Sequence, residues 1–131
     1  MATTTATITL SSSDLTGDAL SLSSTATLTK AGTLTGLDQF TGVARKTFSS
    51  TAQATLVAKG DFTDDRAHKV YIRNTSSVAT ENIILTIESQ LLGRLYAGDW
   101  TLLPFNGDQD IKITPSVATD VIVEFAVFYE A

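Results

Sequence analysis

The side chain best suited to catalysis in this chain is His68, its only histidine. A Ser-His-Asp triad would have to use that imidazole as its base, with a serine held beside it by the fold. Nothing near His68 resembles a nucleophile elbow, the sharp G-x-S-x-G turn that presents such a serine. We therefore interpret His68 as a polar residue at the entrance of a strand.

Three aspartates, Asp61, Asp64 and Asp65, come shortly before this histidine. Carboxylate oxygens are ligands that Ca²⁺ prefers, but the spacing matches no EF-hand loop and lacks that loop's closing glutamate. We interpret the cluster as a solvated turn whose charge is balanced by Arg66.

A second acidic pair, Asp108 and Asp110, follows the dipeptide Asn106-Gly107. Asn-Gly is a strong turn signal, so we interpret both carboxylates as polar groups of a turn. Nothing supports a carboxylate pair for glycoside hydrolysis, and the glycines are too irregularly spaced for a nucleotide-binding loop. The chain has no cysteine for a thiolate metal site or nucleophile. We therefore predict no catalytic residue, no metal site and no cofactor, and expect that the protein is not an enzyme.

Charge and composition narrow the possible partners. Fourteen acidic residues against nine basic ones give a net charge of −5, which opposes contact with a polyanion because clustered Lys and Arg are needed to neutralise phosphates. We expect no nucleic-acid partner. The segment MATTTATITLSSS has no basic region or long apolar core, and no window reaches the length of a membrane span. We expect a soluble, non-secreted protein with no membrane partner.

The segments that would position these polar side chains mostly have the residue pattern of β-strands. The stretch Val121 to Glu130 alternates an apolar face with a half-apolar one, which includes Glu130, and this is typical of a strand in the middle of a sheet. The sequences TAQATLVAKG and IILTIESQLL also fit short helices, but parity in the first and β-branched residues in the second favour strands. Short strands separated by turn signals predict an all-β fold, a single-domain antiparallel sandwich that is jelly-roll-like. The core side chains expected to be largely buried are Ile72, Leu85, Ile87, Ile113, Val123 and Phe125.

The amino-terminal stretch is light and nearly uncharged. In Thr3 to Leu10, apolar residues alternate with threonines, which fits a strand with one buried face. Such a strand at an open edge would pair with a neighbouring chain unless it is covered, whereas small residues that bury little area also fit a disordered or extended arm. We divide the chain into an arm or edge strand, residues 1–18, and a β-sandwich domain, residues 19–131, to which the strand Leu20 to Lys30 would belong. The candidate interaction residues are Thr3, Thr5, Thr7, Ile8, Leu10, Tyr96 and Trp100.

Three segments, KVYIRNTSS, LLGRLYAGDWTLLPF and VIVEFAVFYE, together resemble small virion proteins of tailed bacteriophages. They are similar to capsid decoration or cement proteins with a jelly-roll-like β fold, within residues 68–131. The matching positions, which form a turn and strand frame and not a functional site, are Gly93, Leu95, Gly98 and Pro104. The resemblance implies a homotrimer, made in the host cytoplasm, that sits on the capsid surface of the virion and bridges capsomers of the major capsid protein.

Two other functions are consistent with the sequence. One is a tail or head-fibre component of the virion, and the other is a carbohydrate-binding β-sandwich module that uses exposed aromatic rings. Exposure of Trp100 and Tyr96 on one surface patch would favour sugar binding because such platforms need accessible rings, whereas burial of both would favour lattice binding. A pocket that brings His68 near two carboxylates would point back to an enzyme.

Overall fold

The computed structural model describes residues 3–17 and 19–131, and these form eleven strands and one short 3-10 helix. The elements are β1 (Thr5–Ser12), η1 (Leu15–Gly17), β2 (Leu20–Thr27), β3 (Gln39–Phe40), β4 (Ala44–Phe48), β5 (Ala54–Val57), β6 (His68–Asn74), β7 (Ile83–Ile87), β8 (Gln90–Leu95), β9 (Trp100–Phe105), β10 (Ile111–Pro115) and β11 (Val121–Tyr129). The fold is all-β, as predicted, and the two stretches that also fitted helices contain strands β5 and β7. No helix in this described part is long and apolar enough to cross a membrane.

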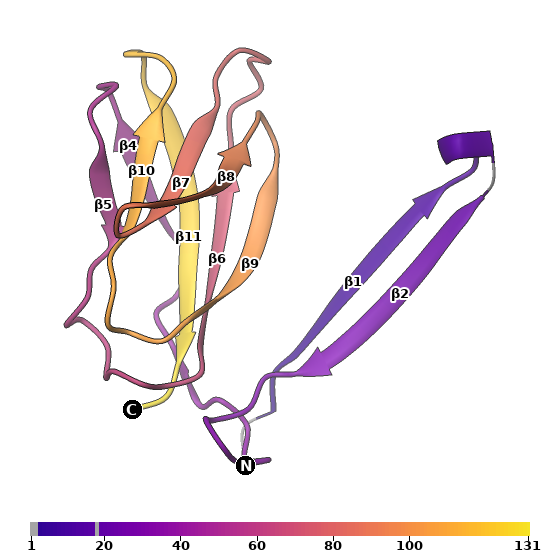
Figure 1. The fold of residues 1–131 in the computed structure, drawn as a ribbon, viewed down its shortest axis with the longest axis vertical. Helices are drawn as coiled ribbons and strands as arrows, with labels where there is room; N and C mark the ends of the chain where they lie inside the picture. The colour runs from indigo at the N-terminus through magenta and orange to yellow at the C-terminus, as the bar shows by residue number, and fades with distance from the viewer. Residues whose placement is uncertain (1–2, 18) are drawn as a thin grey trace.

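Nine of the strands make a sandwich of two antiparallel sheets (Figure 1). One sheet has the order β5-β10-β7-β8, and the other has the order β3-β11-β6-β9, with β4 also paired to β11. Strand β11 is therefore central, as its two-faced pattern predicts, with β6 along one side and β3 and β4 along the other.

The pairing of the sandwich strands is nested. Strand β7 pairs with β8, β6 with β9, β5 with β10, and β4 with β11. Each later strand thus returns beside an earlier one, so the chain from β4 to β11 is arranged as one long hairpin wound into two layers. This nesting places the two outermost partners, β4 and β11, in the same sheet.

The core lies between the two sheets and confirms most of the predicted set. Ile72, Ile113 and Val123 are fully buried and Leu85 nearly so. The prediction is wrong for Ile87 and Phe125, because both are only half-buried at the margin of the core. Ile87 is the last residue of β7. Phe125 pairs with the first residue of β4, an alanine too small to cover the ring, and both line a cavity of ≈ 140 Å³.

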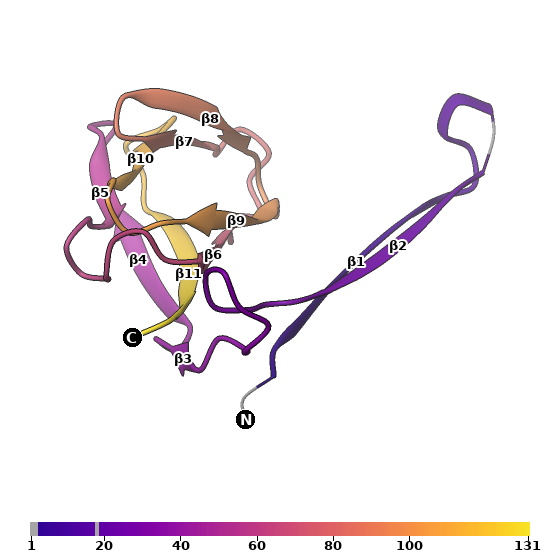
Figure 2. The ribbon, with the colours of Figure 1, turned by 60° about the horizontal axis from the view of Figure 1, so that its bottom comes forward.

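Strands β1 and β2 form a two-stranded sheet of their own that projects from the base of the sandwich (Figures 1 and 2). We call this unit the hairpin arm, residues 5–27 with residue 18 outside the described residues. Its pairing runs from Thr5↔Thr27 to Ser12↔Leu20. The expectation that Leu20 to Lys30 supplies a strand of the sandwich is therefore wrong: β2 pairs with β1. The expectation of a buried face on the first strand is also wrong for this chain, since Ile8 and Leu10 are exposed.

Candidate interaction surface

The hairpin arm has two chemically different faces. Cross-strand partners lie on the same face of a sheet, and successive residues alternate between faces. The register pairs Leu10 with Leu22 and Ile8 with Ser24 on one face, whereas Thr7 pairs with Thr25 on the other. The remaining residues follow the same split, so the first face is mainly apolar and the second consists entirely of Ser and Thr. We call these the apolar face and the hydroxyl face.

The apolar face is open to solvent. The exposed fraction is 45% for Ile8, 51% for Leu10 and 46% for Leu22. On the hydroxyl face, the Oγ1 atoms of Thr7 and Thr25 are hydrogen-bonded at 2.9 Å, which ties the strands together on that side. An isolated two-stranded hairpin is at best marginally stable in water, and an exposed apolar patch of this kind is a candidate interaction surface.

The apolar face looks onto strand β9 across a groove. A cleft of ≈ 480 Å³ is lined by residues of the arm, including Ile8, and by Trp100, Leu102 and Pro104 of β9. A second cleft of ≈ 530 Å³ shares Ile8, Trp100 and Leu102 with the first and extends to Leu10. Because the two clefts share these residues, we treat them as one feature, the arm groove. Figure 2 shows how the arm diverges from the sandwich toward the arm's tip.

Beyond the groove, the outer surface of the β3-β11-β6-β9 sheet is also partly apolar. Phe40 and Phe128 stack with ring centroids 4.7 Å apart. A hollow of ≈ 230 Å³ is lined by these two rings and by Tyr71 and Trp100. The ring centroids of Tyr71 and Trp100 are 6.5 Å apart. The apolar surface therefore continues from the arm across the sheet.

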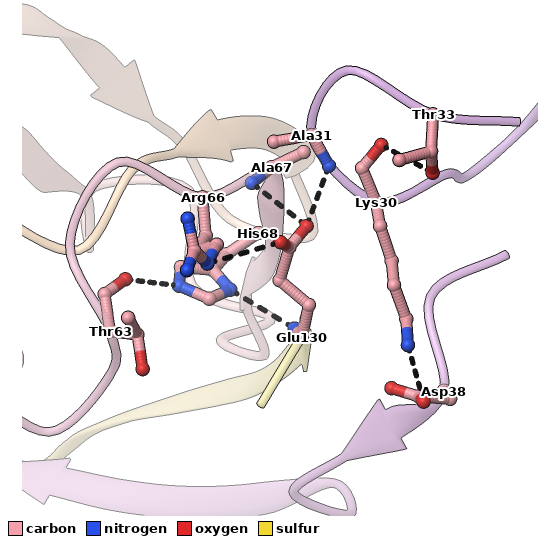
Figure 3. A network of polar contacts seen from close by, with 9 residues as sticks. All are labelled: Lys30, Ala31, Thr33, Asp38, Thr63, Arg66, Ala67, His68 and Glu130. Carbon is pink, nitrogen blue, oxygen red and sulfur yellow. Dashed lines mark hydrogen bonds and ion pairs between the residues drawn. The ribbon is translucent and has the colours of Figure 1, made fainter. Parts of the chain in front are cut away.

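The base of the arm is fastened to the sandwich by the carboxylate of Glu130, which is almost buried (Figure 3). Its Oε2 accepts hydrogen bonds from the backbone N–H of Ala31 at 2.7 Å and of Ala67 at 3.4 Å. Its Oε1 lies 3.3 Å from Nε of Arg66. Arg66 therefore pairs with Glu130 and not with the acidic turn that it was expected to balance. This single carboxylate connects the segment after β2, the segment before β6 and the end of β11.

His68 is the first residue of β6, so its predicted place at a strand entrance is confirmed. Its side chain is fully buried. Its Nδ1 lies 3.3 Å from the backbone N–H of Glu130 and accepts a hydrogen bond from it, so Nε2 carries the proton and donates to the carbonyl oxygen of Thr63 at 2.8 Å (Figure 3). Both ring nitrogens are engaged by backbone groups away from solvent. The imidazole therefore has a structural part and offers no free base.

The segment that follows the arm carries one further ion pair. Lys30 Nζ lies 2.7 Å from Asp38 Oδ2. The hydrogen bond from the Lys30 ammonium lowers the pKa of the Asp38 carboxyl below its ordinary value. The pair closes the loop 30–38 across its exposed side (Figure 3).

The acidic residues singled out in the sequence lie in turns. Asp61, Asp64 and Asp65 are exposed, and among residues 3–17 and 19–131 no group of three or more His, Cys, Asp or Glu side chains is placed to hold a metal ion. Asp108 is exposed, and Asp110 accepts a hydrogen bond from the Lys59 N–H at 2.8 Å. The Asp110 contact joins two loops of the sandwich.

No family model, curated protein or solved structure matches this chain.

Four of the predicted interaction residues line the arm groove: Thr7, Ile8, Leu10 and Trp100. Thr5 and Thr7 lie on the hydroxyl face, and Thr3 is exposed just before β1. Tyr96 is 52% exposed in the turn between β8 and β9, where its N–H donates to Asp99, and Trp100 is 54% exposed. The burial of both rings that would have favoured lattice binding is not found.

The candidate interaction residues predicted from the sequence did not include three apolar residues of this surface, Leu22, Leu102 and Phe128. Their signals are present in the sequence: Leu22 shares a parity with Leu20 and Ala26, and Phe128 lies on the half-apolar face of the last strand. Parity assigns these side chains to a face, but it cannot tell whether that face lies inside the sandwich or outside it.

Proposed function

We propose that this chain is a non-enzymatic structural protein of a bacteriophage particle, a capsid decoration or cement protein. It binds the major capsid protein on the capsid surface and stabilises the shell, and copies of the chain associate as a homo-oligomer, with a trimer as the resemblance implies. The observation that supports this role is the projecting hairpin arm with its open apolar face. A protein that works alone gains nothing from such an arm, whereas extended segments and strand edges are common means of binding a neighbouring subunit.

The nested strand pairing supports the finer assignment of the sandwich as a jelly roll. Eight strands, β4 to β11, pair outermost with outermost and innermost with innermost across two four-stranded layers. Jelly rolls occur in viral capsid and lectin domains, so the fold is compatible with both candidate roles. Fold alone does not decide between them, because function depends on the surface that the fold carries.

The test uses shells assembled from the major capsid protein of the same genome. Purified chain is mixed with these shells, and unbound protein is removed by sedimentation before cryo-electron imaging. The expected result is density on the outer surface at local symmetry axes, together with greater resistance of the shell to heat. Shells without added density, with the chain found instead on tails or head fibres of whole particles, would replace this proposal by the tail or fibre role.

Carbohydrate binding is the second candidate, because Trp100 is half exposed and lies beside Tyr71. Aromatic faces of this kind can stack on sugar rings. A glycan array and isothermal titration would detect binding, and Trp100→Ala should abolish it while Tyr96→Ala, in the neighbouring turn, should not. Loss of sugar binding in Trp100→Ala together with intact shell binding would show two separate functions.

A further inference from the structure

We propose that the arm groove receives the hairpin arm of a second copy of this chain, so that copies associate by exchanging arms. The inference deepens the homo-oligomer part of the proposed function by naming the surface and its occupant. It rests on the composition of the arm, the composition of the groove, the charged residues that each contains, and the length of the arm.

The arm and the groove match in chemistry. The apolar face of the arm presents Ile8, Leu10 and Leu22, all about half exposed. The groove presents Trp100, Leu102 and Pro104 along one side of β9, and its other wall is the chain's own arm with Ile8. Each surface alone leaves apolar side chains in water, and one contact between two copies would cover both.

Charge is compatible with a second copy as the occupant, because the segment that would be inserted is uncharged. The chain carries a net charge of −5, so two copies repel at long range. The strands of the arm, TATITLSS and LSLSSTAT, contain no charged residue, so inserting them adds no further charge to the groove. The groove itself is lined by one basic and one acidic residue, Lys69 and Asp99. An uncharged arm is therefore suited to contact another acidic copy of the same chain.

Size is also compatible. Eight residues per strand at about 3.3 Å each make an arm roughly 26 Å long. A stable interface needs about 800 Å² from each partner. In an exchange every copy both inserts an arm and receives one, so each contributes arm and groove together and buries about twice the area of a one-way contact. Rings closed in this way, two-fold or three-fold, leave no arm unpaired.

The first test compares substitutions on the two faces of the arm by sedimentation velocity and light scattering of the purified chain, without shells. Ile8→Asp and Leu22→Asp place a carboxylate on the apolar face. The matched controls Thr9→Asp and Ser23→Asp place the same charge one residue away, on the hydroxyl face. All four sites are exposed, so the sandwich should keep its unfolding midpoint. We expect the unchanged chain and both controls to associate, and the apolar-face variants to associate at least about 100-fold more weakly.

The second test identifies the contact. Because the chain has no cysteine, two singly substituted chains, Leu10→Cys and Trp100→Cys, can be mixed and oxidised. Each chain has one thiol, so a mixed disulfide can form only between copies. We expect the mixed dimer to predominate over both homodimers, and Ser23→Cys mixed with Trp100→Cys to give much less of it.

Three results would overturn the inference. One is a chain that stays monomeric up to about 100 μM. Another is equal association of apolar-face and hydroxyl-face variants. The third is a monomeric double variant, Leu10→Cys with Trp100→Cys, that closes its disulfide quantitatively while the mixed single variants do not, because the arm would then cover its own groove. A monomeric chain that still binds shells would overturn arm exchange but not the capsid role. An oligomer that does not bind shells would overturn the capsid role but not arm exchange.

Discussion

Replacing Glu130 by glutamine should loosen the junction between the arm and the sandwich. The carboxylate accepts two backbone hydrogen bonds, from Ala31 and Ala67, and forms an ion pair with Arg66. Glutamine keeps one oxygen and turns the other into a donor, so either the backbone amides or the guanidinium must face an N–H group. The side chain of Glu130 is only 9% exposed, so solvent can do little to compensate.

The size of the loss follows from these contacts. A hydrogen bond to a charged group contributes about 1.5–3 kcal/mol. The oxygen that remains is expected to stay with Ala31, whose contact is the shortest, so the partner lost is Arg66. Because the side chain of Arg66 is 42% exposed, solvent screening limits the loss of the ion pair to about 1 kcal/mol. The neutral oxygen of glutamine is also a weaker acceptor for the backbone hydrogen bonds, so we expect a total decrease of about 2 kcal/mol in the free energy of unfolding. This is roughly a 30-fold change in the folding equilibrium.

Two measurements check this expectation. Urea unfolding gives the free energy, and hydrogen exchange at the Ala31 amide reports on the junction itself. The matched control is Glu124→Gln on β11, whose carboxylate pairs with Arg45, 63% exposed, and accepts a hydrogen bond from the Tyr71 hydroxyl. This control should cost less than about 1 kcal/mol. A loss under about 0.5 kcal/mol in Glu130→Gln, with unchanged exchange at Ala31, would refute the idea that this carboxylate holds the base of the arm.

Three further outcomes are expected. Ile72→Ala, at a fully buried site, should lower the free energy of unfolding by about 2–5 kcal/mol in urea titrations, whereas Ile122→Ala, 38% exposed on a neighbouring strand, should cost less than about 1 kcal/mol; equal losses would contradict the assigned faces. Gly107→Ala should lower the thermal midpoint, because Gly107 has φ of 98° and an added Cβ would lie 2.5 Å from a backbone oxygen; an unchanged midpoint would mean that this turn rearranges freely. Lys30→Met should raise the pKa of Asp38 toward its ordinary value in an NMR titration of the carboxyl carbon, since the lysine holds it down. The stabilisation from that pair is present above the ordinary carboxyl pKa and is lost as the pH falls through the lowered pKa of Asp38. In acid, therefore, Lys30→Met and the unchanged chain should no longer differ in stability.

The sequence by itself determines which segments are strands. Alternation with a period of two identifies the strand β6 with the bounds His68–Asn74 and the central strand β11, because a pleated strand must send successive side chains to opposite faces. The same alternation divides the arm into an apolar and a hydroxyl side. These are local properties, set by residue type and backbone geometry, and they were predictable for that reason.

Only the tertiary structure decides what each face meets. The pattern of Leu20–Thr27 fits a strand of the sandwich as well as one of a projecting hairpin, and the pairing with β1 chooses the hairpin. Parity placed Glu130 on the half-apolar face of the last strand, yet its carboxylate is buried because it meets the N–H of Ala31, 99 residues earlier in the chain. Such contacts depend on segments that are distant in sequence and adjacent only after folding, so no local pattern can encode them.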